Sequence, residues 1–189
     1  MSRINHVSIN ARDLQESVDF YVELLGAEPI ATPNFGFPVQ WLGLGDTQLH
    51  LFQKDVTPQS HHHLGISVAD VDPVYRAAER RDAFDRKAFG NHLVELPGDL
   101  VQLYVRDPSG NLVEIDHVGV GRLPEDLRSQ LMRLEDINPQ SDENLSARLF
   151  IGVKAQRAGR PRGQSSRGDL GPRDRISGAG ARLRLVAEV

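Results

Sequence analysis

Two similar stretches of the chain decide its fold: INHVSINARDL, from Ile4 to Leu14, and HHLGISVADV, from His62 to Val71. When the two stretches are aligned, His6 falls on His63, 57 positions further along the chain. Each copy has the pattern of a strand, a short turn and the start of a helix. An internal repeat of this length predicts two related structural modules.

The first copy has the alternation of a strand that leads into a helix. Val7 and Ile9 alternate with polar neighbours, which places apolar side chains on one sheet face and polar ones, including His6, on the other. Asp13 is a typical helix N-cap. Apolar residues at helical spacing follow Asp13, and Gly26 ends this helix. The first module therefore begins with a strand and then a helix.

The second copy predicts the same order of elements. Leu64 and Ile66 form the apolar face of its strand, and His63 lies on the opposite face. Asp72 and Pro73 are the cap and first-turn signals of the helix that follows.

Both modules continue with strand-like runs, VQWLGLGDTQLHLFQ in the first and LVELPGDLVQLYVRDPSGNLVEIDHV in the second. Residues 107–111, DPSGN, are a turn signature between strands. Matching the final strands aligns LHL with VEI, so His50 and Glu114 occupy equivalent places between apolar residues that face the helices. His50 and Glu114 are therefore predicted on the sheet face that carries His6 and His63.

Four side chains that can bind a metal thus share one face. The sequence has no cysteine, so any metal must be held by nitrogen and oxygen ligands. Imidazole nitrogens with a carboxylate suit divalent Fe, Mn, Co, Ni or Zn, and two histidines with one carboxylate leave positions open for substrate or oxygen. We predict one divalent metal ion, bound by His6, His63 and Glu114.

His50 has two interpretations. As a fourth ligand it completes a set of three histidines and one glutamate; otherwise it is free to move a proton near neutral pH. A bulge, or a shift of two residues along the strand, would bring Gln48 to the metal instead. Glu114 and His50 are the candidate catalytic residues.

The other histidines fit the site less well. His61 and His62 are predicted to be exposed, because only His63 precedes an apolar residue as His6 does. His92 and His117 have no repeat partner and are interpreted as ordinary packing or surface residues. Strand alternation further suggests substrate-facing positions for a small set of residues: Gln40, Gln48, Gln102 and Tyr104, with Trp41 as a wall or a core plug.

The chain is expected to have four parts: a first module at 1–58, a second at 59–120, a helical extension at 121–153 and a tail at 154–189. In the extension, 124–134 and 142–150 are predicted as short helices that cover a sheet edge or a partner subunit. The tail carries nine Lys or Arg and three Asp or Glu, a net charge of +6. Because the whole chain has a net charge of −4, the rest of the chain has a net charge of −10. Rich in Gly, Arg, Ser and Pro, the tail is predicted to be disordered.

Composition also narrows the partners and the location. The tail lacks aromatic residues among its arginines and the body is acidic, so we do not expect nucleic acid to bind. No apolar run approaches the roughly 20 residues that span a bilayer, and the N-terminal residues lack the layout of a secretory signal. We expect a cytoplasmic homodimer that acts on a small molecule.

The motifs quoted above, with FYVELLG and YVRDPSGNLVEI, resemble the vicinal-oxygen-chelate superfamily, which includes glyoxalase I, methylmalonyl-CoA epimerase, fosfomycin-resistance transferases, extradiol dioxygenases and bleomycin-binding proteins. The resemblance extends from Ile4 to Val118. It implies an α+β fold in which two paired βαβββ modules form a cup-shaped mixed sheet. It also implies metal ligands on the first and last strands of each module, which map to His6, His50, His63 and Glu114.

The resemblance leaves the reaction open. Glyoxalase I-like enzymes often have a carboxylate at the position of His50, epimerase-like enzymes often have glutamine, and the transferases have no ligand there. In this family the metal chelates two adjacent substrate oxygens and stabilises charge as it develops. We therefore expect a metal-dependent lyase or isomerase that acts on a small oxygen-rich substrate. The alternatives are an extradiol-type ring-cleaving dioxygenase, with His6, His63 and Glu114 as its iron ligands, and a metal-free protein that binds a drug or another small molecule.

Overall fold

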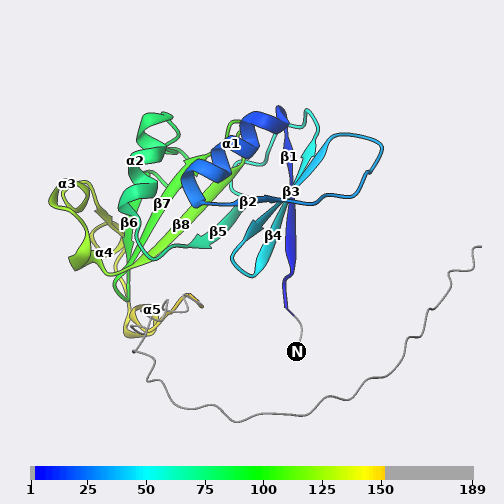
Figure 1. Ribbon diagram of the computed structural model, residues 1–189. Helices are drawn as coiled ribbons and strands as arrows, with labels where there is room; N and C mark the ends of the chain where they lie inside the picture. The colour runs from blue at the N-terminus through cyan, green and yellow to red at the C-terminus, as the bar shows by residue number, and fades with distance from the viewer. Residues whose placement is uncertain (1–2, 152–189) are drawn as a thin grey trace, which may run out of the picture. The chain divides into compact units, whose positions relative to one another are not determined.

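The computed structural model describes residues 3–151, all of which belong to one compact unit. Two mixed β-sheets and their helices make up this part of the chain (Figure 1). The predicted α+β fold is therefore confirmed. The tail predicted at 154–189 lies outside the described residues. Within residues 3–151, none of the helices has the length and apolar composition needed to cross a membrane.

The first sheet has the strand order β1-β4-β3-β2. Strand β1 runs parallel to β4, whereas β3 is antiparallel to both of its neighbours. Helix α1 connects β1 to β2. The bounds of these elements are β1 His6–Ala11, α1 Leu14–Leu25, β2 Glu28–Ile30, β3 Val39–Leu44 and β4 Thr47–Gln53.

The second sheet repeats this arrangement with the order β5-β8-β7-β6-β9. Strand β5 is parallel to β8, and β7 is antiparallel to β6 and β8. Helix α2 occupies the place that α1 has in the first module. The bounds are β5 His63–Ser67, α2 Asp72–Arg80, β6 Leu93–Leu96, β7 Leu100–Arg106, β8 Leu112–Val118 and β9 Met132–Arg133.

The helix ends follow the sequence in the first module and differ from the prediction in the second. The Asp13 carboxylate accepts the backbone N–H of Glu16 at 2.9 Å, and Gly26 ends α1 in the left-handed region at φ 63°. Asp72, by contrast, is the first residue of α2 rather than its cap. Its carboxylate accepts from Arg76 at 3.0 Å, and no side chain caps this helix.

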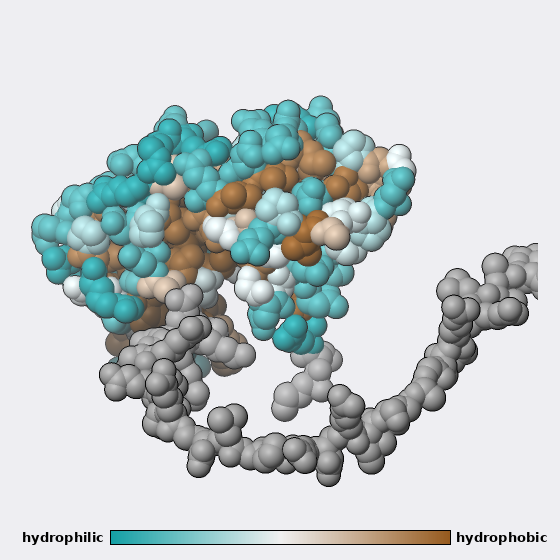
Figure 2. All heavy atoms as spheres, viewed as in Figure 1, coloured by the Kyte–Doolittle hydropathy of each residue, from teal (hydrophilic) through white to brown (hydrophobic). Residues whose placement is uncertain are grey.

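The apolar strand faces pack against the helices to form the core. Leu49 and Leu51 on β4 are buried, as are Val113 and Ile115 on β8. Helices α1 and α2 lie side by side over this layer (Figure 1). In Figure 2 the surface over α2 is largely hydrophilic, and hydrophobic residues are visible where the helix meets the strands. This packing leaves the other face of each sheet for polar side chains.

The predicted turn at 107–111 joins the two modules. Tyr21 on α1 donates its hydroxyl hydrogen to the buried Asp107 carboxylate at 3.0 Å. Ser109 accepts the backbone N–H of Arg12 at 2.7 Å, and the side chain of Asn111 donates to the carbonyl of Asn10 at 2.8 Å. The turn between β7 and β8 is therefore bound to the end of β1 and to α1.

The C-terminal extension is less helical than predicted. The segment expected at 124–134 contains one single-turn helix, α3 (Glu125–Arg128), and the segment at 142–150 contains another, α5 (Asp142–Leu145). Two further short elements lie next to them: a 3₁₀ turn at Val120–Arg122 and the single-turn helix α4 at Leu134–Ile137. Met132 and Arg133 instead form β9, because their backbone pairs with the open edge of β6.

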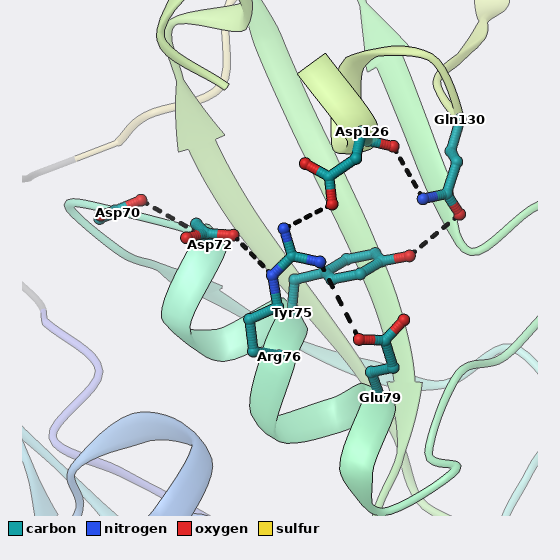
Figure 3. Close-up of polar contacts among 7 residues, drawn as sticks. All are labelled: Asp70, Asp72, Tyr75, Arg76, Glu79, Asp126 and Gln130. Carbon is teal, nitrogen blue, oxygen red and sulfur yellow. Dashed lines mark hydrogen bonds and ion pairs between the residues drawn. The ribbon is translucent and has the colours of Figure 1, made fainter. Parts of the chain in front are cut away.

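One ion-pair cluster attaches this extension to α2 (Figure 3). The Arg76 guanidinium lies 2.6 Å from Asp126 and 3.0 Å from Asp72. Tyr75 donates to the Gln130 side chain at 3.0 Å. These contacts attach residues 126–130 of the extension to α2, on the helix-covered side of the second module.

Candidate functional site

Strand register places the candidate ligands of the two modules at equivalent positions. Ser8 on β1 pairs with His50 on β4, and Gly65 on β5 pairs with Glu114 on β8. Ser8 and Gly65 are matched in the sequence repeat, so His50 and Glu114 are also equivalent. This confirms the match made from the final strands. Paired residues in neighbouring strands share a sheet face, as do residues two apart in one strand. His6 therefore lies on the same face as His50, and His63 on the same face as Glu114.

In the first module, His50 lies between two flat rings. The His6 and His50 rings stack with centroids 4.4 Å apart, and the Trp41 ring stacks on His50 at 4.2 Å. The Nε2 atom of His50 is 2.9 Å from the Gln48 side-chain oxygen. Gln48 is therefore on the same face, hydrogen-bonded to one candidate ligand and beside another.

The environment of His50 favours the neutral form of its ring. Burial lowers the pKa of His50, and the nearby His6 lowers it further. His50 is only 6% exposed. A neutral imidazole can bind a metal through a ring nitrogen or accept a proton, so both interpretations of His50 are consistent with its surroundings.

In the second module, His63 and Glu114 face each other. The Nε2 atom of His63 lies 3.5 Å from Oε2 of Glu114. The Nδ1 atom of His63 is 2.8 Å from the carbonyl oxygen of His61, which can only accept, so Nδ1 carries a hydrogen. In the neutral ring, Nε2 then has a lone pair directed toward a carboxylate. A proton or a metal cation between the two groups would remove that repulsion.

Asp116 is a neighbour of this pair that sequence analysis missed. It lies two residues after Glu114 on β8, on the same face, and both carboxylates are buried. Burial raises the pKa of Glu114, and the nearby Asp116 raises it further. Burial also raises the pKa of Asp116. Strand alternation from Glu114 could have identified Asp116.

A chain of hydrogen bonds holds Asp116 from the side of β7. Gln102 donates to the Asp116 carboxylate at 3.1 Å, and Tyr104 donates its hydroxyl hydrogen to Gln102 at 2.6 Å. A Cβ added at Gly65 would lie 3.7 Å from an Asp116 oxygen and 3.8 Å from a Glu114 oxygen. Glycine therefore leaves space between the first strand and the two carboxylates.

The structure brings the four candidate ligands together as two pairs. His6 and His50 lie together on the first sheet, and His63 and Glu114 on the second. Across residues 3–151, no three His, Asp or Glu side chains converge closely enough to hold a metal ion. Each module thus supplies half of the predicted ligand set.

The other residues singled out in the sequence divide clearly. Gln48, Gln102, Tyr104 and Trp41 lie on the ligand-bearing faces, but Gln40 does not. Gln40 pairs with Leu51, which faces the helices, and its side chain bonds to the carbonyl of Ile30 at 2.9 Å. The prediction for Gln40 was wrong because its neighbour Trp41 lies on the ligand-bearing face, so Gln40 lies on the opposite face. The sequence did not fix the face of Trp41.

The remaining histidines fit ordinary packing or surface roles. His61 and His62 are exposed, as predicted. His117 pairs with Val101 on the helix-facing side of the second sheet and is buried. His92 packs against the Phe84 ring at 4.4 Å between centroids.

A sequence model of a known family matches residues 3–115 of this chain; it describes the glyoxalase/bleomycin resistance protein/dioxygenase superfamily. The mitochondrial methylmalonyl-CoA epimerase of Mus musculus is 25% identical over 134 residues, covering 61% of this chain and 73% of that protein. Glyoxylase I 4 of Arabidopsis thaliana is 29% identical over 126 residues, covering 61% and 70%. The fosfomycin resistance protein FosX of Listeria monocytogenes has a similar fold, with a TM-score of 0.51 at 13% identity over 68% of this chain and 98% of that one.

Proposed function

Because the chain belongs to the glyoxalase/bleomycin resistance protein/dioxygenase superfamily, we propose that it is a metal-dependent enzyme that acts on a small oxygen-rich substrate. The reaction we propose is of the lyase or isomerase type, the classes to which the names of the epimerase and glyoxylase relatives point. The observation that carries the proposal is the equivalent placement of His6 with His50 and of His63 with Glu114 on two sheets of the same topology.

The residues present fit a divalent cation. Three imidazoles and a carboxylate are a ligand set that first-row transition metals accept. Glu114 and Asp116 are buried close together, so each loses solvation when ionised and repels the other. A cation near Glu114 would compensate that cost, and it would also separate the carboxylate from the lone pair of His63 Nε2.

The protein groups then have separate tasks. When bound, the metal supplies Lewis-acid stabilisation of the negative charge that develops on substrate oxygens. His6, His63 and Glu114 hold it, and the His61 carbonyl orients the His63 ring. His50 has a neutral imidazole at neutral pH and a hydrogen bond to Gln48, so it can hold or move a proton at Nε2 if it is not a fourth ligand.

We propose further that the site is assembled between two chains. One chain carries the two ligand pairs on separate sheets, and each pair is incomplete by itself as a metal site. A symmetric dimer would place the His6–His50 pair of one protomer opposite the His63–Glu114 pair of its partner, and it would form two such sites. In this arrangement the homodimer is needed to complete each metal site.

A complementation experiment tests the metal site and its assembly together. His6→Ala and Glu114→Gln are each expected to abolish tight metal binding as homodimers. After mixed chains are unfolded and refolded at a 1:1 ratio, about half of the dimers should be mixed, and each mixed dimer should contain one intact site. About a quarter of the wild-type metal capacity should return, measured by calorimetry with Mn(II) or Co(II).

A matched control uses two changes within the same proposed site. Mixing His63→Ala with Glu114→Gln should restore no capacity, because both substitutions lie in the same half-site, so each of the two sites of a mixed dimer contains one of them. If the first mixture restores no capacity while wild-type chains bind metal fully, the site lies within one chain. If wild-type protein binds no transition metal near neutral pH, the enzyme proposal fails and a metal-free binding protein replaces it.

An extradiol-type dioxygenase would use the same His6, His63 and Glu114 ligands, with His50 beside them as an acid or base. Oxygen uptake separates this alternative from the proposed reaction. Iron-loaded protein should consume no oxygen with the substrate of a lyase or isomerase, whereas a ring-cleaving enzyme would consume one O₂ for each ring opened.

A further inference from the structure

A hollow of about 560 Å³ lies on the ligand-bearing face of the first sheet, beside His6 and His50. Its volume lies within the usual range for small-molecule sites. It is lined from β1, β3, β4 and the loop between β2 and β3. The lining residues used below are His6, Phe35, Trp41, His50 and Phe52.

Aromatic rings form most of the hollow's apolar lining. The Phe35 ring lies 6.0 Å from Trp41 and 6.2 Å from Phe52, measured between ring centroids. Phe35 remains 43% exposed. Centroid separations of 4.5–7 Å are those that aromatic pairs prefer, so a further ring placed against Phe35 could make contacts of the same kind.

Next to Phe35, the lining is flat. Trp41, His50 and His6 form one continuous stack, with ring planes 6° and 15° apart at the two contacts. The two histidines in this stack are candidate metal ligands. An aromatic group bound against the apolar lining would therefore place its substituents close to the proposed metal site.

The loop that carries Phe35 is held in place. The Asn34 side chain accepts the backbone N–H of Gly36 at 2.8 Å, and Gly36 adopts φ 76°, where a side chain would be strained. Thr32 accepts the backbone N–H of Trp41 at 2.9 Å, which attaches the loop to β3. A fixed position for Phe35 lowers the ordering cost of binding a ligand.

We propose that this hollow binds an aromatic ring of the substrate and orients two adjacent oxygens of the same molecule toward His6 and His50. The role of this molecule as a substrate rests on the proposed function, but binding of its ring does not need the metal. The rim favours an uncharged ring, because Arg3 is paired with Asp46 at 3.3 Å and the lining beside Phe35 is apolar.

The single tryptophan of the chain makes the hollow directly observable. Trp41 gives one indole N–H signal in a ¹⁵N-labelled full-length sample, and its fluorescence is the only tryptophan emission. The probes are mandelate, which carries a phenyl ring beside two adjacent oxygen groups, and hexahydromandelate, which has the same oxygens and a saturated ring. Both are titrated into protein treated with EDTA. Mandelate should shift the indole signal and bind about 3- to 10-fold more tightly than hexahydromandelate.

Two phenylalanines of matched exposure separate ring binding from a general loop effect. Phe35 lines the hollow, and Phe37 is 42% exposed on the same loop but does not line it. Phe35→Leu should remove the preference for mandelate, whereas Phe37→Leu should change it by less than about 2-fold. Equal affinity for the two probes, or a preference that survives Phe35→Leu, would overturn the proposal.

The outcome is distinct from that of the metal test. If mandelate perturbs Trp41 in protein that binds no transition metal, ring binding stands and the enzyme proposal fails. If metal binds but mandelate and hexahydromandelate behave alike with and without it, the enzyme proposal stands and the aromatic assignment is wrong.

Discussion

The Nε2 atom of His63 lies 3.5 Å from Oε2 of Glu114, while the other ring nitrogen of His63 donates to the carbonyl of His61. The ring is therefore held with Nε2 directed toward a buried carboxylate. Such an arrangement costs free energy unless a positive charge lies between the two groups. The hydrogen bond from His63 to the His61 carbonyl therefore orients the ring so that a metal ion could lie between Nε2 and Glu114.

Glu114→Gln should weaken metal binding by more than about 10-fold, because the amide keeps the size of the side chain but removes the charge that neutralises a dication. His50→Ala should reduce affinity less, because water can fill one vacant position while three ligands remain. Metal titration of both variants, with turnover where a substrate is identified, checks this order. Full occupancy in Glu114→Gln together with complete loss in His50→Ala would show that the ligand set is wrong.

Tyr21→Phe should lower the free energy of unfolding by about 1–2 kcal/mol, because it removes a donor from the buried Asp107 carboxylate. Tyr75→Phe is the matched control. It also removes a tyrosine hydroxyl, but its partner Gln130 is exposed to water and should regain a hydrogen bond there, so the loss should be smaller. Urea unfolding of both variants measures the difference. Equal losses would argue against Asp107 as the link between the modules.

The stability of the protein should fall as the pH is lowered from about 6.5 to about 4, in part because of His92. Burial, together with the nearby Arg86 charge, lowers the pKa of His92 to about 4. The unfolded chain, with an ordinary histidine pKa near 6.5, takes up its proton first, so protonation favours unfolding within this range. His92→Gln should flatten the pH dependence by about 1–3 kcal/mol between pH 7 and pH 4. The exposed His62→Gln should leave the slope unchanged in the same denaturant series.

Local rules explain most of the agreement between sequence and fold. The Asp13 cap and the left-handed Gly26 depend only on neighbouring residues, and both are present. The alternation around His50 and Glu114 also held, because a strand with one buried face cannot shift by one residue without exposing its apolar side chains. The prediction for Gln40 failed because β3 carries apolar residues on both faces, Val39 and Trp41 on one and Leu42 and Leu44 on the other, so its sequence does not fix which face is buried.

The sequence by itself determined the repeat and the face on which His6, His50, His63 and Glu114 lie, since these follow from the two-residue period of strands and from local helix signals. The paired βαβββ modules were implied by the family resemblance, and the strand order of each sheet came from the structure. Only the tertiary structure decided that the ligands form two pairs and that Phe35 joins Trp41 beside the first pair. Those relationships depend on how distant segments pack, and a loop such as 31–38 has no periodic pattern that fixes where its side chains lie.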